Sequence, residues 1–459
     1  MPKVLYVVHN HPAVMPGGAE TYALELYGAM RDSGRYDPLL LARTGPPVSR
    51  SGRVHEGTLL EPVGGDPNQY FFHTDIEDYD WFLSTSRNKD VYTKFYRDFL
   101  AAYRPEVVHF QHTLFLGYDI LRETRRTLPD SAIVYTLHEY VPICHNNGQM
   151  FRTTGERCLG ASPRRCHECF PAIPPQEFFL RERFIKSHLG VVDRFLSPSR
   201  FLAQRYVDWG IDPARITVEE NGRPPLAAVP DRGPDRNEEQ DAGRPNRARI
   251  GYFGQFTAFK GADVLMKAMK LLAERRMAGP PILDAVHPTL RLHGANIEHQ
   301  PEEFQALFRS LLDTAGDDIT LMGRYRPDEL PALMRAVDWV VVPSIWWENA
   351  PLVIQEAFAH GRPVICSDIG GMAEKVTDGV DGLHFRAGDA HSLADTIERA
   401  VGTPGLWERL RAGIGEVHPL GRHVTNLADL YDDLVAAHAG RPGAPSARHK
   451  TARRSAHVG

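Results

Sequence analysis

Two glutamates lie eight positions apart in an apolar stretch of the chain, SIWWENAPLVIQEAFAHGRPVICSD, which runs from Ser344 to Asp368. A carboxylate that is buried without a partner loses its charge or destabilises the fold by several kcal/mol. Glu356, which has apolar residues around it, therefore needs hydrogen-bond donors from the protein or from a ligand. Glu348 has a simpler alternative. A carboxylate at a helix N-terminus complements the helix dipole and needs no further role to explain it.

A second group with chemical potential is Lys260, which is followed by Gly261 in the segment GQFTAFKGADVL. This segment joins a predicted strand, RIGYF, to a predicted helix. An ammonium group and a flexible glycine at a helix N-terminus form an anion site, and a diphosphate is a natural occupant. The alternative is a surface lysine near a helix cap. The free N–H groups of Leu352 and Val353, at the start of another predicted helix, favour the phosphate interpretation.

The elements around the two glutamates are predicted from short apolar runs. DWVVVPS before them and RPVICSD after them indicate buried parallel strands. The residues between predict a crossover helix with Pro351 at its first helical position and a stop at Gly361. Such a helix has no clearly wet face, so Glu356 is expected to be buried on it. Glu348 is expected in the strand-to-helix loop.

The rest of the chain repeats this alternation of strands and helices, which is typical of doubly wound α/β domains. We predict a first domain over 1–228, a polar linker over 229–248 and a second domain over 249–420. A helix over 421–439 is expected to pack back on the first domain, and 440–459 reads as a disordered basic tail. Two such sheets side by side form a cleft at the carboxyl ends of their strands.

Composition limits the classes of protein to consider. A chain of 459 residues with 42% apolar content predicts two or three domains. The net charge of −5 argues against a nucleic-acid partner. The N-terminal apolar run is too short for a signal peptide, and no stretch of about 18 apolar residues occurs. We therefore expect a cytoplasmic protein, with contact at the inner face of a membrane left open.

The ordered motifs resemble the retaining glycosyltransferases of family 4, which have the GT-B fold of two Rossmann-like domains facing across a cleft. The resemblance covers nearly the whole chain apart from the linker and the tail, and it includes a cysteine-rich loop in the first domain. The motifs are Gly17-Gly18 after the first strand, RPEVVHFQH, TLHEY, the ENG of Glu220–Gly222, FGQFTAFKG, and Glu348 followed by Glu356.

The resemblance implies a nucleotide-diphosphate sugar donor and a role for each matching residue. Glu356 would hold the ribose hydroxyls, Lys260 would neutralise the diphosphate, and Glu348 would contact the donor sugar. His138 would lie beside that sugar, and it is implied to be catalytic together with Lys260 and Glu348. The further donor-binding residues are Gly17, Gly18, Gln255, Asn349, Ala350, Pro351 and Leu352, with the glycines permitting close approach.

One position departs from the family pattern. Many members carry an arginine beside the diphosphate where this chain has Gln255. Either another cation compensates, with Arg223 and Arg324 as the candidates, or donor binding is weaker. The sequence leaves both alternatives open.

The activity that the resemblance implies is transfer of a sugar to an acceptor hydroxyl of a glycan, a lipid-linked sugar or a small molecule, with retained configuration. No carboxylate is an evident nucleophile, so a front-face substitution is expected, and no metal is required because Lys260 and the helix N-termini supply positive charge. The rival interpretations are a nucleotide-sugar epimerase or phosphorylase on the same fold, and a catalytically silent binding module. The aromatic segment 69–92 is expected to line the acceptor side.

Four of the five cysteines fall within residues 144–169, and the last two form a Cys-x-x-Cys pair. Four thiolates in a reducing compartment suit a tetrahedral structural zinc. The first two are spaced more widely than in common zinc ribbons, so free thiols and redox-sensitive pairs are alternatives. Cys366, alone in a predicted strand, is expected in the core. The predicted zinc ligands are Cys144, Cys158, Cys166 and Cys169.

Overall fold

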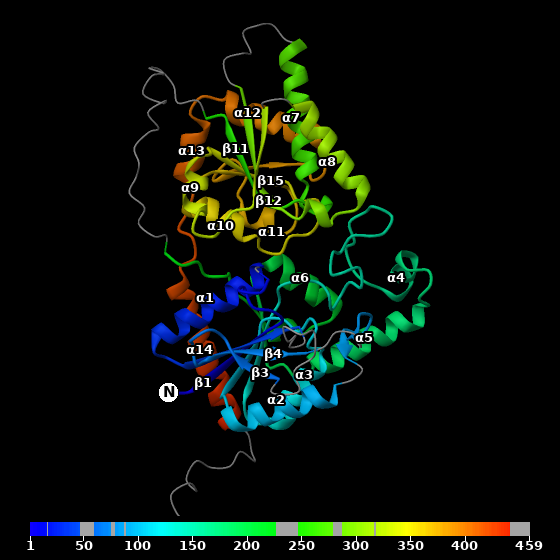
Figure 1. Cartoon of the computed structure of the whole chain (residues 1–459), viewed down its shortest axis with the longest axis vertical. Helices are drawn as coiled ribbons and strands as arrows, with labels where there is room; N and C mark the ends of the chain where they lie inside the picture. The colour runs from blue at the N-terminus through cyan, green and yellow to red at the C-terminus, as the bar shows by residue number, and fades with distance from the viewer. Residues whose placement is uncertain are drawn as a thin grey trace, which may run out of the picture.

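A computed structural model shows two α/β domains, one above the other in Figure 1. The predicted linker and tail lie almost wholly outside the residues that it describes. No helix in the described part of the chain is long and apolar enough to cross a bilayer. The described residues are 1–15, 17–45, 59–74, 79–86, 89–225, 247–278, 287–315 and 318–440.

The N-terminal domain is built on an eight-stranded sheet in the order β10-β9-β8-β7-β1-β2-β4-β3. Its strands pair in parallel except β3 with β4. The predicted apolar runs form β1 (Lys3–Val8), β2 (Asp37–Thr44), β7 (Val107–Phe110), β8 (Ala132–Thr136) and β9 (Arg194–Ser197). The sequence did not indicate β3 (Leu60–Pro62), β4 (Gln69–His73) or β10 (Ile216–Val218), nor the separate pair β5 (Tyr79–Asp80) and β6 (Thr85–Ser86).

Helices cover both faces of this sheet, as a doubly wound fold requires (Figure 1). The first begins at Gly18, ten positions after the end of β1 at Val8, and Gly34 ends it with a left-handed φ of 65° that glycine adopts without strain. The helices are α1 (Gly18–Ser33), α2 (Asp90–Tyr103), α3 (Asp119–Thr127), α4 (Pro163–Cys169), α5 (Pro175–Leu189) and α6 (Arg200–Trp209).

The C-terminal domain has six parallel strands in the order β13-β12-β11-β14-β15-β16. Numbered within the domain, this is the order 3-2-1-4-5-6 of a Rossmann fold, which confirms the predicted fold class. Its strands are β11 (Arg249–Gln255), β12 (Thr289–Ala295), β13 (Ile319–Gly323), β14 (Trp339–Val342), β15 (Val364–Ser367) and β16 (Gly382–Phe385). Its helices are α7 (Ala262–Ala278), α8 (Glu302–Ala315), α9 (Leu330–Arg335), α10 (Leu352–Ala359), α11 (Gly370–Lys375), α12 (Ala390–Gly402) and α13 (Leu406–Gly413).

The crossover helix α10 is shorter than the sequence predicted. Pro351 has a ψ of 117°, which is extended, so it precedes the helix as its N-cap and is not the first helical residue. Gly361 follows the end of the helix with a left-handed φ of 63°. Cys366 in β15 is fully buried, as expected for a core residue.

The last helix, α14 (Leu420–Ala439), leaves the C-terminal domain and runs into the N-terminal one beside α1 (Figure 1). Buried Leu427 and Tyr431 share an apolar cluster with Val4 and Tyr6 of β1. The Tyr431 hydroxyl also lies 2.6 Å from Nδ1 of the buried His109. The chain therefore crosses between the domains twice, and its second crossing ends in the core of the first domain.

This packing predicts the effect of truncating Leu427. Because its side chain is 1% exposed, Leu427→Ala should leave a cavity and lower the free energy of unfolding by roughly 2–5 kcal/mol. Chemical denaturation followed by circular dichroism measures this. Asp433→Ala, on the exposed side of the same helix, is the control and should change it by less than about 0.5 kcal/mol. Equal effects of the two variants would contradict the packing.

Candidate functional site

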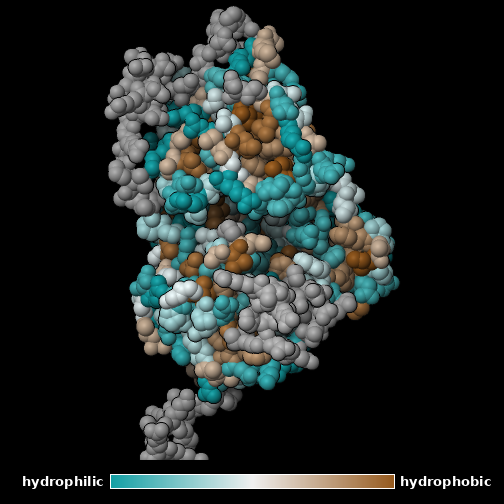
Figure 2. All heavy atoms as spheres, in the orientation of Figure 1, coloured by the Kyte–Doolittle hydropathy of each residue, from teal (hydrophilic) through white to brown (hydrophobic). Residues whose placement is uncertain are grey.

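The predicted site residues of the two domains meet across one cleft, which Figure 2 shows as a hollow between the two lobes. A Cβ on Gly18, at the start of α1, would lie 3.8 Å from the Leu352 side chain at the start of α10. The Asn349 amide donates to the carbonyl of His138 in the other domain. The N-terminal ends of α1 and α10 therefore face each other.

Lys260 and Glu348 form a direct ion pair, with 2.6 Å between Nζ and Oε1. The same oxygen accepts hydrogen bonds from Ser344 Oγ at 2.7 Å and Trp346 Nε1 at 2.9 Å. Burial alone raises the pKa of Glu348, but the Lys260 charge and these hydrogen bonds outweigh it, so the pKa lies below its ordinary value. Among the described residues no donor reaches Oε2, which is thus available to a ligand hydroxyl.

Close backbone contacts fix the segments that carry this pair. Gly261 has a φ of 69°, and a Cβ there would lie 2.0 Å from the carbonyl oxygen of Pro343. The Gly371 N–H donates to the Glu348 carbonyl at 2.7 Å, and a Cβ on Gly371 would lie 1.8 Å from the Asn349 carbonyl oxygen. Gly261 was expected from its motif and Gly371 was not, although a glycine pair soon after a buried strand is a usable signal.

Glu356, on α10, is paired with Arg223 at 2.9 Å between Oε1 and Nη2. Arg223 comes from the other domain, and its Nη1 lies 3.2 Å from Glu25 Oε2 on α1. One guanidinium therefore serves two carboxylates. Burial raises the pKa of Glu356 and of Glu25, and the charge of Arg223 offsets this only in part. Both carboxylates are partly exposed, with side chains that are 23% exposed at Glu25 and 19% exposed at Glu356, so a ligand with hydroxyl groups can reach them. Glu25 was not expected from the sequence.

The two cations considered as substitutes for the missing arginine at Gln255 already have carboxylate partners. Gln255 is exposed at the end of β11. Arg324 bonds Asn296 and Glu298 on the surface, with its side chain 69% exposed. Arg223 is engaged with Glu25 and Glu356. Among the described contacts, neither arginine forms a hydrogen bond or ion pair with Glu348.

On the N-terminal side of the cleft, His138 is held by Gln111 and Tyr22. Its Nε2 lies 3.1 Å from Gln111 Oε1, and its ring meets the Tyr22 ring edge-on at 5.3 Å between centroids. Burial lowers the pKa of His138 to about 4, so the ring is neutral near pH 7. Gln111 Nε2 is buried without a hydrogen-bond partner in the described chain.

A further buried pair beside His138 was not predicted. Glu20 Oε1 on α1 lies 2.9 Å from His9 Nε2 at the end of β1. Burial raises the pKa of Glu20, but its bonds to His9 outweigh this and hold the pKa below its ordinary value. A Cβ on Gly17 would come within 2.4 Å of the Glu20 carboxylate. Gly17 therefore leaves room for the Glu20 carboxylate. The sequence had suggested only that glycine here permits close approach of a ligand.

The four clustered cysteines line one small cavity in the loop 144–169. Burial raises the pKa of Cys144 and raises that of Cys166 to about 11. In the described chain no three of the sulfur atoms lie within 4.8 Å of one another. A tetrahedral zinc needs sulfur atoms roughly 3.8 Å apart, so the donor set fits zinc while the side chains must still draw together.

The cysteine loop also touches the neighbours of the central ion pair. The Cys158 carbonyl accepts a hydrogen bond from Trp347 Nε1 at 2.9 Å, next to Glu348. The Phe151 ring meets that of Phe259, next to Lys260, at 5.4 Å between centroids. The loop therefore contacts the chain neighbours of both Glu348 and Lys260.

Two family models match the chain. The model for Glycosyltransferase Family 4 matches residues 16–225, and the model for Glycosyl transferases group 1 matches residues 247–403. Together they cover most of the chain, with the break at the predicted linker. The predicted membership of the family 4 glycosyltransferases is thereby confirmed, and the cysteine-loop subgroup stays a prediction.

Curated relatives and solved structures agree with this match. The D-inositol 3-phosphate glycosyltransferase of Salinispora arenicola is 31% identical over 260 residues, 54% of this chain and 56% of that protein. The lipopolysaccharide 1,2-N-acetylglucosaminetransferase of Salmonella typhimurium is 27% identical over 290 residues, 62% of this chain and 69% of that protein. The chain thus spans about half the length of the first of these relatives.

Among solved structures, sucrose-phosphate synthase from Thermosynechococcus elongatus superimposes with a TM-score of 0.66 at 18% identity, over 95% of this chain and 100% of that one. Anabaena HepE in complex with UDP and glucose gives a TM-score of 0.60 at 15% identity, over 94% and 100%. At such identities the likeness shows the fold, which is the GT-B arrangement expected from the sequence.

The shared guanidinium predicts a difference between the two arginines. Arg223→Gln should lower the free energy of unfolding by roughly 1–3 kcal/mol, because two half-buried carboxylates lose their cation. Arg324→Gln is the matched control and should cost no more than about 1 kcal/mol, since it removes an exposed pair. Denaturant titrations of both variants near pH 7 make the comparison. A loss for Arg223→Gln no larger than for the control would show that the pairing does not contribute.

Proposed function

Because the chain belongs to the family 4 glycosyltransferases of GT-B fold, we propose that it transfers a sugar from a nucleotide-diphosphate donor to an acceptor hydroxyl and retains the configuration of the sugar. The acceptor is a glycan, a lipid-linked sugar or a small molecule. The fold neighbour HepE was determined with UDP and glucose, so UDP-sugars are the first donors to test.

The observation that carries the proposal is the pair of ion pairs beside α10. Lys260 with Glu348 lies before the start of the helix, and Arg223 with Glu356 lies on it. The first offers a cation and a free carboxylate oxygen to a sugar diphosphate, next to the N–H groups of the helix. The second offers a carboxylate to the ribose hydroxyls. Glu348 is buried, and one of its oxygens accepts from three donors. A carboxylate that only complemented a helix dipole would need neither feature.

The chemistry follows from this charge arrangement. As the bond between the sugar and the diphosphate breaks, negative charge grows on the diphosphate and positive charge on the sugar. Lys260 and the α10 N-terminus stabilise the first, and the ionised Glu348 stabilises the second. The departing diphosphate takes the acceptor proton on the same face, so the configuration is retained. These groups supply the positive charge for the step themselves, and we propose that it proceeds without a metal ion.

Donor binding and donor turnover are tested separately. A thermal-shift panel of nucleotide-diphosphate sugars identifies the donor, because a ligand that binds only the folded state raises its stability. Incubation with the donor alone distinguishes an epimerase, which would change the sugar without an acceptor. Transfer to a panel of acceptors, with the product anomer assigned by NMR, tests the reaction. A β-linked product from an α-linked donor would refute retention, and binding without turnover under any acceptor would favour a silent binding module.

Substitutions of the two glutamates should have different effects on kcat and KM. Glu356→Gln should chiefly raise KM for the donor, by on the order of tenfold to a hundredfold, because a charge-assisted bond to the ribose is similar in ground and transition states. Glu348→Gln should lower kcat more than it raises KM, because its contact strengthens as the sugar gains charge. Steady-state kinetics of both variants decide this, and an unchanged kcat in Glu348→Gln would remove it from the chemistry.

We also propose that Cys144, Cys158, Cys166 and Cys169 hold a structural zinc. The support is their shared cavity and the four-thiolate donor set, which leaves no open coordination position. The loop contacts Trp347 and Phe259, so a zinc that orders the loop would also order the donor side of the cleft. The metal would take no part in the chemical step.

Metal analysis tests this zinc. Reduced protein dialysed against a mild chelator should retain about one zinc per chain, because four thiolates bind tightly. Cys169→Ser should retain little, whereas Cys366→Ser, at the buried cysteine outside the loop, is the control and should keep it. Retention of zinc in Cys169→Ser, or a wild-type chain without zinc, would contradict the assignment.

A further inference from the structure

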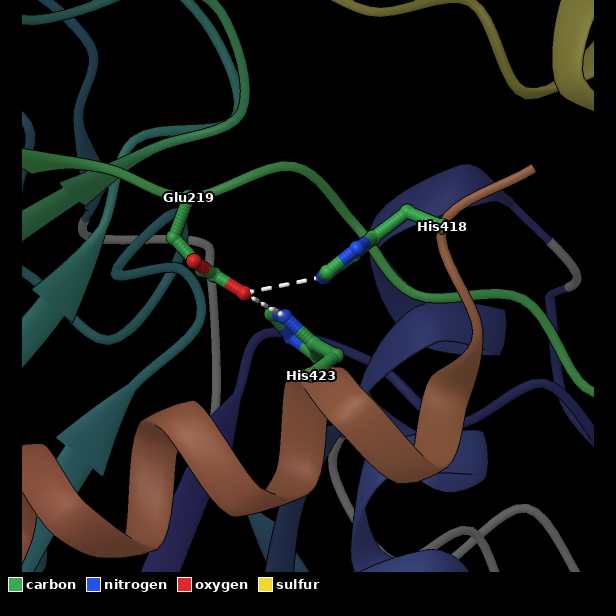
Figure 3. A group of neighbouring side chains, drawn as sticks. All are labelled: Glu219, His418 and His423. Carbon is green, nitrogen blue, oxygen red and sulfur yellow. Dashed lines mark hydrogen bonds and ion pairs between the residues drawn. The ribbon is translucent and has the colours of Figure 1, made fainter. Parts of the chain in front are cut away.

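A second group of metal-ligating side chains lies next to the chain segment that carries Arg223, where Glu219, His418 and His423 converge (Figure 3). Glu219 Oε1 lies 2.9 Å from His423 Nδ1 and 3.0 Å from His418 Nε2. Within the described residues this is the one group of three or more such ligand atoms that all lie within 4.8 Å of one another. Figure 3 shows both imidazole rings aimed at the same carboxylate oxygen.

We propose that Glu219, His418 and His423 bind a dication of the zinc class. Two imidazole nitrogens and one carboxylate oxygen are ligands that zinc prefers, with bonds of about 2.0–2.2 Å. Tetrahedral bonds of that length place neighbouring ligand atoms roughly 3.3 Å apart. The two distances from Glu219 Oε1 to the imidazole nitrogens, 2.9 and 3.0 Å, are therefore close to that spacing, and all three ligand atoms lie within 4.8 Å of one another. Glu219 and His418 are 15% and 16% exposed, which leaves an entry path and a position for water.

The surrounding side chains hold two of these ligands in the required orientation. Tyr22 OH lies 2.7 Å from His423 Nε2, the ring nitrogen opposite the one directed at Glu219. The Tyr22 hydroxyl can donate to Nε2 while Nδ1–H bonds Glu219, and it can accept from Nε2–H in the other tautomer, which leaves Nδ1 free to bind metal. The Asn426 amide lies 3.1 and 3.3 Å from the two oxygens of Glu219 and orients the carboxylate.

The site joins the two places where the chain crosses between the domains. Glu219 follows β10, just before the chain leaves the N-terminal domain, and His418 precedes α14, where the chain returns. The backbones are already bonded there, with Arg223 N donating to the His418 carbonyl at 2.9 Å. A Cβ on Gly222 would lie 2.6 Å from the His423 Cβ, so the segments pass very close. Movement of one domain relative to the other bends the chain at these crossings, and a bound metal restrains it.

The competing explanation uses no metal. The two rings can each donate an N–H to the Glu219 carboxylate, and the three side chains then form a hydrogen-bonded latch between the crossings. His418→Gln separates the two, because the glutamine amide can still donate to Glu219 while the imidazole ligand is lost.

The experiment is a titration of the full-length chain with Zn²⁺ by calorimetry and with Co²⁺ by absorption, after dialysis against a mild chelator. Wild-type protein should bind one Co²⁺ with nitrogen and oxygen ligands, without the charge-transfer absorption that thiolate ligands give. His418→Gln should weaken Zn²⁺ binding at least about tenfold, the loss expected even for an outer partner of a metal ligand. His299→Gln removes an exposed histidine beside Glu298 and should bind like the wild type.

Hydrogen exchange gives a second readout that depends on location. Zn²⁺ should slow exchange in peptides around Glu219 and Val417 in the wild type and in His299→Gln, and leave them unchanged in His418→Gln. Equal Zn²⁺ affinity in wild type and His418→Gln, or no wild-type binding beyond the thiolate-held zinc, would overturn the proposal and leave the hydrogen-bonded latch.

Discussion

The need to neutralise one buried and one half-buried carboxylate around a short helix governs the centre of this molecule. Glu348 is buried, whereas Glu356, which was expected to be buried, has a side chain that is 19% exposed, so water can contribute only in part to stabilising its charge. The chain meets the need in two ways. Glu348 takes Lys260 from its own domain, and Glu356 takes Arg223 from the other one. The second solution requires the two domains to meet at this helix.

The two pairs differ in how far charge is balanced, and the difference matters for ligand binding. Glu348 has a dedicated lysine and two further donors, and its pKa lies below the ordinary value. Glu356 shares one guanidinium with Glu25, and the pKa values of both carboxylates are raised. A ligand that brings hydroxyl donors therefore gains most at Glu356, whereas a ligand that brings phosphate gains most at Lys260. A nucleotide-diphosphate sugar carries both groups.

Contacts that hold the domains together surround this centre. The cysteine loop reaches from the N-terminal domain to Trp347 and Phe259, which adjoin the two residues of the Lys260–Glu348 pair. On another side of the interface, the chain crossings meet at Glu219, His418 and His423. Tyr22 links the crossings to the cleft, because it bonds His423 and packs against His138. Both places are therefore linked to the Lys260–Glu348 and Arg223–Glu356 pairs through packed and hydrogen-bonded side chains.

The sequence by itself determined the fold class and most of the strands, and it singled out Lys260, Glu348 and Glu356, which the structure brings together around α10. It could do so because β-branched runs, glycines at forced turns and a lysine at a helix start are local patterns with local causes. Only the tertiary structure decided that Arg223 serves Glu356 and Glu25, that Glu20 fills the space left by Gly17, and that Glu219 meets two histidines about 200 positions away. The short strands β3, β4 and β10 also escaped prediction, since neighbouring strands and not their own residues define them. Each of these depends on segments far apart in the chain, and the energy of burying a charge or pairing an edge strand exists only after those segments have come together.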